Sequence, residues 1–202
     1  MLQRVVHCLA ARPAVFDALR WLLEAGHHTE RRVIAGEGIA NAIRVLDLGC
    51  GTGVFTGSFG QAQYFGIDVN AAYVTHARRK FPRQRFCVMD GANMGFAAGV
   101  FDAVLIGGVL HHLPDGVCVS ILKETFRVLR SGGTLLLWED IPTQIAWNLP
   151  GKIVHALDEG RHIRKEADYL ALVRPWFTVV RTYRMLCGVC DYTVVVCRIP
   201  GS

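Results

Sequence analysis

The spacing of apolar positions along the chain changes at about residue 43. Before it, apolar residues recur at helical spacing after Pro13, which predicts an amphipathic helix over residues 13–25. Residues 30–42 are polar and contain glycine, so they indicate a connector. Beyond residue 43, short apolar runs alternate with segments of helical periodicity. This alternation predicts repeated βα units, and therefore a parallel sheet covered by helices on both faces.

The predicted elements follow one another in regular order. We expect strands at 43–48, 64–68, 85–89, 101–106 and 134–138, and helices at 54–61, 71–80 and 116–130. One or two further helices are expected within residues 143–173. Two β-rich runs, 177–186 and 192–199, close the chain. The connection between them is too short for a parallel crossover, so they are predicted to form an antiparallel hairpin.

The stretch Val45-Leu46-Asp47-Leu48-Gly49-Cys50-Gly51-Thr52-Gly53 is the strongest candidate for a ligand site. An apolar strand ends near a carboxylate and runs into glycines at every second position. Glycines allow the backbone to approach a ligand closely. We expect the helix that follows to offer unpaired N–H groups to a polar or anionic group. In open α/β sheets, ligands bind at the carboxyl ends of the strands, which is where this turn lies.

Three other strand ends reach the same edge of the predicted sheet. Asp68 ends the second strand, where a carboxylate can accept both hydroxyls of a ribose. Asp90 follows the third strand, within reach of a base amino group, and Gly107-Gly108 ends the fourth. A single acidic residue at a strand end is as often a simple turn residue as a ligand-binding residue. Taken together, the four strand ends predict a nucleoside ligand whose polar tail lies over the glycine turn.

The glycine spacing separates this site from a dinucleotide site. The third glycine of the G-x-G-x-x-G fingerprint would fall at Val54, which disfavours NAD. The chain contains six motifs, of which the first includes this spacing: Val45 to Gly53, Gly66-Ile67-Asp68, Met89-Asp90-Gly91-Ala92, Phe101-Asp102-Ala103-Val104, Leu110-His111-His112-Leu113-Pro114-Asp115 and Leu129-Arg130-Ser131-Gly132-Gly133-Thr134-Leu135. Through these motifs, residues 43–199 resemble the class I S-adenosylmethionine-dependent methyltransferases, and among them the small-molecule enzymes related to quinone biosynthesis.

The resemblance implies a fold and an activity. The implied fold is an α/β, Rossmann-like three-layer sandwich. Its seven-stranded, mostly parallel sheet has the order 3-2-1-4-5-7-6, with strand seven antiparallel. The implied activity is methyl transfer from S-adenosyl-L-methionine to an oxygen, nitrogen or carbon atom of a small molecule, with S-adenosyl-L-homocysteine as product and no metal.

The resemblance also implies which residues contact the cofactor. Asp47 and Gly49 would lie beside the methionine moiety, with Gly51 in close backbone approach. Asp68 would hold the ribose hydroxyls and Val69 would lie against the adenine. The remaining implied contacts are Cys50, Asp90 at the adenine amino group, Gly91, Ala92 beside the ring, and the carbonyl of Gly107 at the methionine ammonium. The family often has Ser, Asn or Cys where Gly107 stands.

The sequence offers one candidate for a general base. Methyl transfer from a sulfonium is a displacement that needs mainly orientation, and a base helps only where the acceptor must lose a proton. His111 follows the fourth strand, and a histidine can accept a proton near neutral pH. The alternative is that this His-His-Leu-Pro turn is architectural. Other candidates near the strand ends are His112, Asp115, Glu139 and Asp140, and beyond strand five the segment with His155, Asp158, Arg161, His162 and Arg164.

The net charge of +5 raises the question of a nucleic-acid partner. Its densest source is the run Arg78, Arg79, Lys80, Arg83 and Arg85. The helix before it runs antiparallel to the strands, which puts this run at the edge opposite the cofactor and favours a solvated helix C-terminus. Nucleic acid is therefore not expected as a partner. Two alternatives remain: a cofactor-binding protein or regulatory subunit without catalysis, and, more weakly, a nucleic-acid methyltransferase.

Cysteine usage and hydropathy set the remaining expectations. Seven cysteines are a poor disulfide framework, and Cys187-Gly-Val-Cys190 is interpreted as a strand-end turn rather than a redox or metal motif. Adjacent His27 and His28 point to different sides, so a metal pair is not expected there. No apolar run approaches the roughly 18 residues of a membrane span. We expect a single cytoplasmic domain with an N-terminal helix and connector (1–42), a cofactor-binding half (43–140) and substrate-side helices with a C-terminal hairpin (141–202).

Overall fold

The computed structural model describes residues 12–143 and 162–200, which contain one seven-stranded sheet of order β3-β2-β1-β4-β5-β7-β6. Neighbouring strands from β3 to β5 are parallel, whereas β7 is antiparallel to both β5 and β6. The predicted order and the predicted hairpin are both confirmed. The strands are β1 (Arg44–Leu48), β2 (Gln63–Asp68), β3 (Arg85–Val88), β4 (Phe101–Gly107), β5 (Leu129–Asp140), β6 (Thr178–Cys187) and β7 (Cys190–Arg198).

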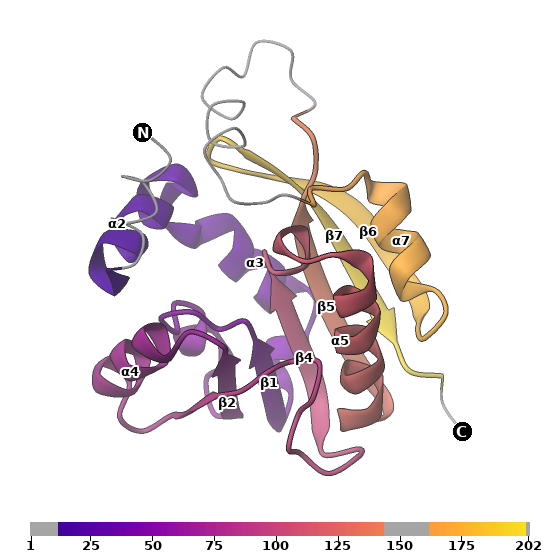
Figure 1. Cartoon of the computed structure of the whole chain (residues 1–202), viewed down its shortest axis with the longest axis horizontal. Helices are drawn as coiled ribbons and strands as arrows, with labels where there is room; N and C mark the ends of the chain where they lie inside the picture. Colours follow the sequence, from indigo (N-terminus) through magenta and orange to yellow (C-terminus); the bar gives the residue numbers. More distant parts are fainter. Residues whose placement is uncertain (1–11, 144–161, 201–202) are drawn as a thin grey trace.

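Helices cover both faces of the sheet and enclose two apolar cores. The helices are α2 (Pro13–Leu23), α3 (His28–Gly36), α4 (Ala71–Lys80), α5 (Asp115–Val128) and α7 (Glu166–Val173). Figure 1 shows α5 and α7 together on one face, where Leu122 and Val173 pack with Leu135 of the sheet. On the other face, Ile34 of α3 and Val74 of α4 belong to the second core. The sheet therefore carries buried side chains on both sides, as expected for a parallel sheet.

The predicted helix over residues 54–61 is wrong. The chain there makes successive turns and then a 3₁₀ segment over Thr56–Phe59. Glycines at 53, 57 and 60 interrupt this stretch, and two of them, Gly53 and Gly60, have positive φ. Glycine is among the poorest helix formers, which explains why no regular helix forms. The polar groups at the end of β1 therefore belong to the turn itself and not to an α-helix N-terminus.

The predicted connector over residues 30–42 is also wrong. It contains most of α3 and a second 3₁₀ segment, Ile39–Asn41. Val33 and Ile34 of α3 are buried, as expected for an amphipathic helix, but Glu30 is also only 1% exposed. The apolar face of the helix could not be recognised from the sequence, because a glutamate is normally expected at a solvent-exposed position and Glu30 is buried.

The boundary between α5 and β5 differs from the predicted one, and part of one predicted region cannot be compared. Strand β5 is longer than the expected 134–138, and it begins within the helix expected over residues 116–130. That helix, α5, ends earlier, at Val128. The helices expected after strand five, with His155, Asp158 and Arg161, fall largely on residues 144–161, which lie outside the described residues. Only α7 from that region is described.

In the part of the chain that is described, none of the helices combines the length and the hydropathy that crossing a bilayer requires.

Candidate functional site

The turn after β1 has a backbone that side-chain-bearing residues rarely adopt. Gly49, Gly51 and Gly53 have φ angles of 76°, 52° and 79°. At Gly49 a Cβ atom would also overlap the side chain of Val109. Left-handed backbone costs about 1–2 kcal/mol for an L-residue, so glycines are required at this spacing. The turn leaves its backbone bare at the carboxyl edge of the sheet, as a close-approaching ligand requires.

Asp68 connects the second strand to this turn. Its Oδ2 accepts a hydrogen bond from the Gly51 N–H at 2.9 Å, and its Oδ1 accepts from the Asn70 N–H at 2.8 Å. The Asn70 side chain in turn caps α4 by accepting from two backbone N–H groups. Asp68 is half-buried. A carboxylate oxygen has two lone pairs, so each oxygen of Asp68 can accept a further hydrogen bond from a ligand.

Asp47 lies beneath the turn in an apolar environment. It is 2% exposed, and the Tyr64 hydroxyl donates a hydrogen bond to its Oδ2 at 2.5 Å. The pKa of Asp47 is raised to about 7 overall, because burial and the nearby charge of Asp68 outweigh the opposing effect of the hydrogen bond from Tyr64. A carboxyl group with a pKa in this range can be neutral alone and ionised beside a cation.

The residues expected around the adenine differ in exposure. Val69 is 71% exposed and Asp90 is also exposed, with its Oδ1 accepting from the Ala92 N–H at 2.8 Å. Gly91 is buried against Leu48. These residues are brought to one edge by the parallel pairing of β1, β2 and β3.

Cys50 and Gly107 present backbone and not side chains to this edge. The Cys50 thiol is buried in the second core, where burial raises its pKa. At Gly107, the Trp138 indole fills the space that a Cβ atom would take. This gives the family departure at Gly107 a physical reason, because a larger residue would collide with Trp138.

His111 is held by a carboxylate at the end of β5. Its Nδ1 lies 2.7 Å from Glu139 Oε2, and both residues are buried. The other Glu139 oxygen accepts from the N–H groups of Val109 and Leu110, so one side chain fixes both the turn and the imidazole. His111 Nε2 lies 3.7 Å from Asp140 Oδ2. When Nδ1 donates to the carboxylate, Nε2 is left as the basic nitrogen.

Arg164 is engaged in the protein's own structure. Its guanidinium pairs with Asp115 at 2.6 Å and donates to the carbonyls of Leu110 and Leu113. Burial lowers its pKa, but the hydrogen bond and charge of Asp115 outweigh this and the pKa is raised overall. In this arrangement Arg164 holds the turn that carries His111.

One contact of the glycine turn was missed from sequence. The Thr52 hydroxyl donates to Asp17 of α2, and Lys80 of α4 pairs with the same carboxylate at 3.2 Å. These residues are far apart in the chain and form no motif, so no sequence signal could have found them. The contact places α2 over the turn.

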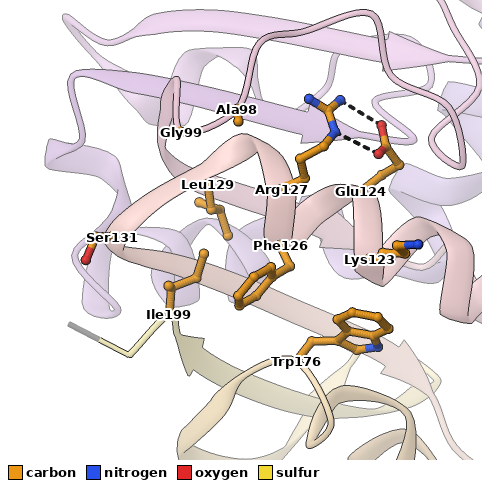
Figure 2. Close-up of a pocket in the computed structure, with 10 residues that line it drawn as sticks. All are labelled: Ala98, Gly99, Lys123, Glu124, Phe126, Arg127, Leu129, Ser131, Trp176 and Ile199. Carbon is orange, nitrogen blue, oxygen red and sulfur yellow. Dashed lines mark hydrogen bonds and ion pairs between the residues drawn. The ribbon is translucent and has the colours of Figure 1, made fainter. Parts of the chain in front are cut away.

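A surface hollow of about 650 Å³ lies away from these residues. Figure 2 shows Phe126, Trp176 and Ile199 lining it, with the Arg127–Glu124 ion pair at its rim. Residues Gly99 and Leu129, before β4 and at the start of β5, place it at the amino edge of the sheet. It is therefore at the edge opposite the glycine turn.

The chain is similar in sequence to known methyltransferases. Residues 45–133 match the family model described as a methyltransferase domain. The chain is 30% identical over 135 residues to the ubiquinone/menaquinone biosynthesis C-methyltransferase UbiE of Desulfotalea psychrophila, covering 63% of this chain and 54% of that protein. It is 34% identical over 95 residues to a probable tRNA methyltransferase 9B of Mus musculus, covering 46% of this chain and 21% of that protein.

A solved structure shares the fold over almost the whole chain. The N-methyltransferase NodS of Bradyrhizobium japonicum, in complex with S-adenosyl-L-homocysteine, has a TM-score of 0.76 at 16% identity and covers 96% of this chain and 97% of that one. The chain spans about half the length of the first curated relatives it matches. Residues 45–133 therefore resemble a methyltransferase domain, and the chain has the sheet order and fold that its resemblance to the class I S-adenosylmethionine-dependent methyltransferases implied.

Proposed function

We propose that this protein binds S-adenosyl-L-methionine at the carboxyl edge of β1, β2 and β3 and transfers its methyl group to a small molecule. The observation that carries the proposal is the hydrogen bond from the Gly51 N–H to Asp68, because it joins the bare glycine turn to a carboxylate that can still accept from a ribose. The matches to methyltransferases support the same ligand.

The residues present fit this cofactor. The glycine turn has a left-handed backbone and no side chains at Gly49, Gly51 and Gly53, and the buried Asp47 can ionise beside the methionine ammonium. The exposed Val69 offers an apolar surface to the adenine, and Asp90 an acceptor to its amino group. When bound, the cofactor supplies a methyl group on a sulfonium that already has a good leaving group. The protein then has to orient the acceptor and exclude water, an effect worth about 7–11 kcal/mol in well-oriented systems.

We assign His111 as the general base for an acceptor that must lose a proton. Glu139 orients the ring through Nδ1, which leaves Nε2 to take the proton. We favour a small-molecule acceptor over nucleic acid. Within the basic run, Arg78 donates to the carbonyl of Phe86 and Lys80 pairs with Asp17, so these two cations already have partners in the protein.

Cofactor binding is tested by calorimetry with S-adenosyl-L-homocysteine. Asp68→Ala should weaken binding at least about tenfold, because a carboxylate bound to two hydroxyls makes charge-assisted hydrogen bonds. Asp102→Ala is the matched control, since Asp102 lies at the opposite end of a strand and pairs with Arg130. Unchanged affinity in Asp68→Ala would contradict the placement of the ribose.

Catalysis is tested by release of S-adenosyl-L-homocysteine with a panel of phenols, carboxylic acids and amines. His111→Gln should lower kcat about 10²- to 10⁴-fold for acceptors that lose a proton while leaving cofactor affinity unchanged. His112→Gln, at the adjacent exposed position, is the control. Cofactor binding without turnover on any acceptor would favour the non-catalytic alternative. Equal rates in His111→Gln would leave the turn with an architectural role.

A further inference from the structure

Four buried polar side chains lie outside the proposed methyl-transfer site. Glu24 follows α2, His27 and Glu30 lie at the start of α3, and Cys187 ends β6. Their exposed fractions are 5%, 3%, 1% and 0%. Carboxylates are almost never buried to this degree unless they are paired or bind a metal. The carboxylates of this cluster therefore need a positively charged partner.

Three of these side chains converge on one point. Glu24 Oε2 and His27 Nδ1 are 2.7 Å apart, and His27 Nδ1 and Glu30 Oε1 are 3.4 Å apart. All three ligand atoms lie within 4.8 Å of one another. Zinc bonds of about 2.0–2.2 Å set tetrahedral ligands about 3.3–3.6 Å apart, so only small movements separate these atoms from a coordination shell.

The hairpin brings a thiol to the same cluster. Cys187 Sγ donates to Glu30 Oε2 at 2.8 Å and to the Glu24 carbonyl at 3.1 Å. The backbone N–H of Val189 in the hairpin turn also donates to the carbonyl of Leu23. Two carboxylates, an imidazole and a thiol thus meet where α2, α3 and the β6–β7 hairpin come together. Imidazole and thiol donors favour zinc, whereas calcium and magnesium prefer oxygen alone.

The charges of the cluster leave one negative charge uncompensated. Arg20 pairs with both oxygens of Glu24, and Tyr192 donates to the same carboxylate. Glu30 then has no full positive charge opposite it while the His27 ring is neutral. In the metal-free protein, a proton on His27 would supply that charge.

Protonation is an incomplete solution for His27. Within residues 12–143 and 162–200, its Nε2 has no hydrogen-bond partner. An imidazolium would therefore bury a charged N–H donor without an acceptor, which costs more than a neutral one. A neutral ring that binds a cation through Nδ1 leaves only a neutral N–H at Nε2.

We propose that Glu24, His27 and Glu30 bind a zinc ion, with the Cys187 sulfur beside the fourth coordination position. The ion has a structural role, because it would fix the junction of α2 and α3 against the hairpin. The His27 ring packs edge-on against Phe55, which follows the glycine turn, at a centroid distance of 5.6 Å. This site is independent of the proposed methyl transfer and could be occupied whether or not the protein is an active enzyme.

The test compares two adjacent histidines in the full chain. Wild type, His27→Gln and His28→Gln are loaded with zinc under reducing conditions, freed of excess metal, and assayed for zinc content and unfolding midpoint with and without chelator. His28 is exposed and serves as the control for adventitious surface binding. Wild type and His28→Gln should retain stoichiometric zinc, and chelation should lower their unfolding midpoints. His27→Gln should lose at least about tenfold in zinc affinity, since even outer-shell changes cost 10- to 100-fold.

A second readout does not depend on the variants folding. Cobalt substitution of the wild type should give the intense visible absorption of a four-coordinate site. Absence of these bands, absence of stoichiometric zinc in the wild type, or wild-type zinc affinity in His27→Gln would each overturn the proposal. The cluster would then be a network of ion pairs completed by a proton on His27.

Discussion

Asp47 is the residue whose chemistry depends most on its surroundings. The same carboxylate that the sequence placed in a ligand loop is 2% exposed and bonded to Tyr64. Burial raises its pKa to about 7, whereas an unperturbed aspartate ionises near 3.8. The sequence shows that residue 47 is an aspartate, but its protonation state depends on burial, which the neighbouring sequence does not reveal.

Asp47 should make the folding stability of the cofactor-free protein depend on pH. Because its pKa is raised on folding, its contribution is fully present below about pH 4 and is lost as the pH rises through 7. Asp47→Asn cannot ionise, so its stability relative to wild type should increase between pH 4 and pH 8, by up to about 4 kcal/mol. Urea unfolding at the two pH values measures this change.

Asp102→Asn should show the opposite dependence of folding stability on pH. Burial raises the pKa of Asp102, but the hydrogen bond from Arg130 outweighs it and the net pKa is lowered. Its contribution is therefore present above the unfolded pKa and is lost as the pH falls. The same relative stability of Asp47→Asn and wild type at both pH values would contradict the buried, neutral state of Asp47.

At the scale of elements, α2 is positioned by a contact that joins distant parts of the chain. Asp17 accepts from Thr52 in the glycine turn and pairs with Lys80 at the end of α4. The amphipathic pattern correctly predicted the helix but gave no information on what it covers. Only the tertiary structure shows that it packs beside the glycine turn, where it can shield a bound cofactor from water.

Removing this carboxylate should loosen α2. Asp17→Ala is expected to speed hydrogen exchange in residues 13–23, because the helix then loses its polar link to Thr52 and Lys80. Exchange in β4 should stay unchanged. Asp102→Ala, which removes a paired aspartate at the other edge of the sheet, should not affect α2. Equal exchange of α2 in wild type and Asp17→Ala would show that its apolar contacts alone hold it.

At the scale of the whole molecule, stability is concentrated in the middle of the sheet. Leu46 of β1, Val104 of β4 and Leu136 of β5 are fully buried, and these strands have neighbours on both sides. In contrast, β3 and β6 are edge strands with many exposed side chains. The single-domain organisation over all residues stays a prediction, because residues 144–161 are outside the described chain.

Native-state hydrogen exchange should reproduce this order. Amides of β1, β4 and β5 should exchange last, with a free energy close to that of global unfolding, whereas those of β3 and β6 should open at lower cost. Mass spectrometry of peptides after labelling measures the difference. Protection in β3 that equals that of β4 would indicate that the sheet opens only as a unit.

The sequence by itself determined the order of the elements along the chain, because each parallel strand is a short apolar run and the last connection is short enough only for a hairpin. It also predicted that Asp47, Asp68, Asp90 and the glycine turn lie at one edge, since a parallel sheet must bring these strand ends together. It failed at residues 30–42 and 54–61, where a buried glutamate and repeated glycines made local pattern a poor guide.

Only the tertiary structure decided which polar groups meet across distant parts of the chain. Three pairs join residues that are far apart in the sequence and form no motif: Glu139 with His111, Asp17 with Thr52, and Cys187 with Glu30. Their pairing depends on how the turns and helices pack against the sheet. Packing thus decides the hydrogen-bond partners of each group, so the chemistry of these groups is not set by residue type alone.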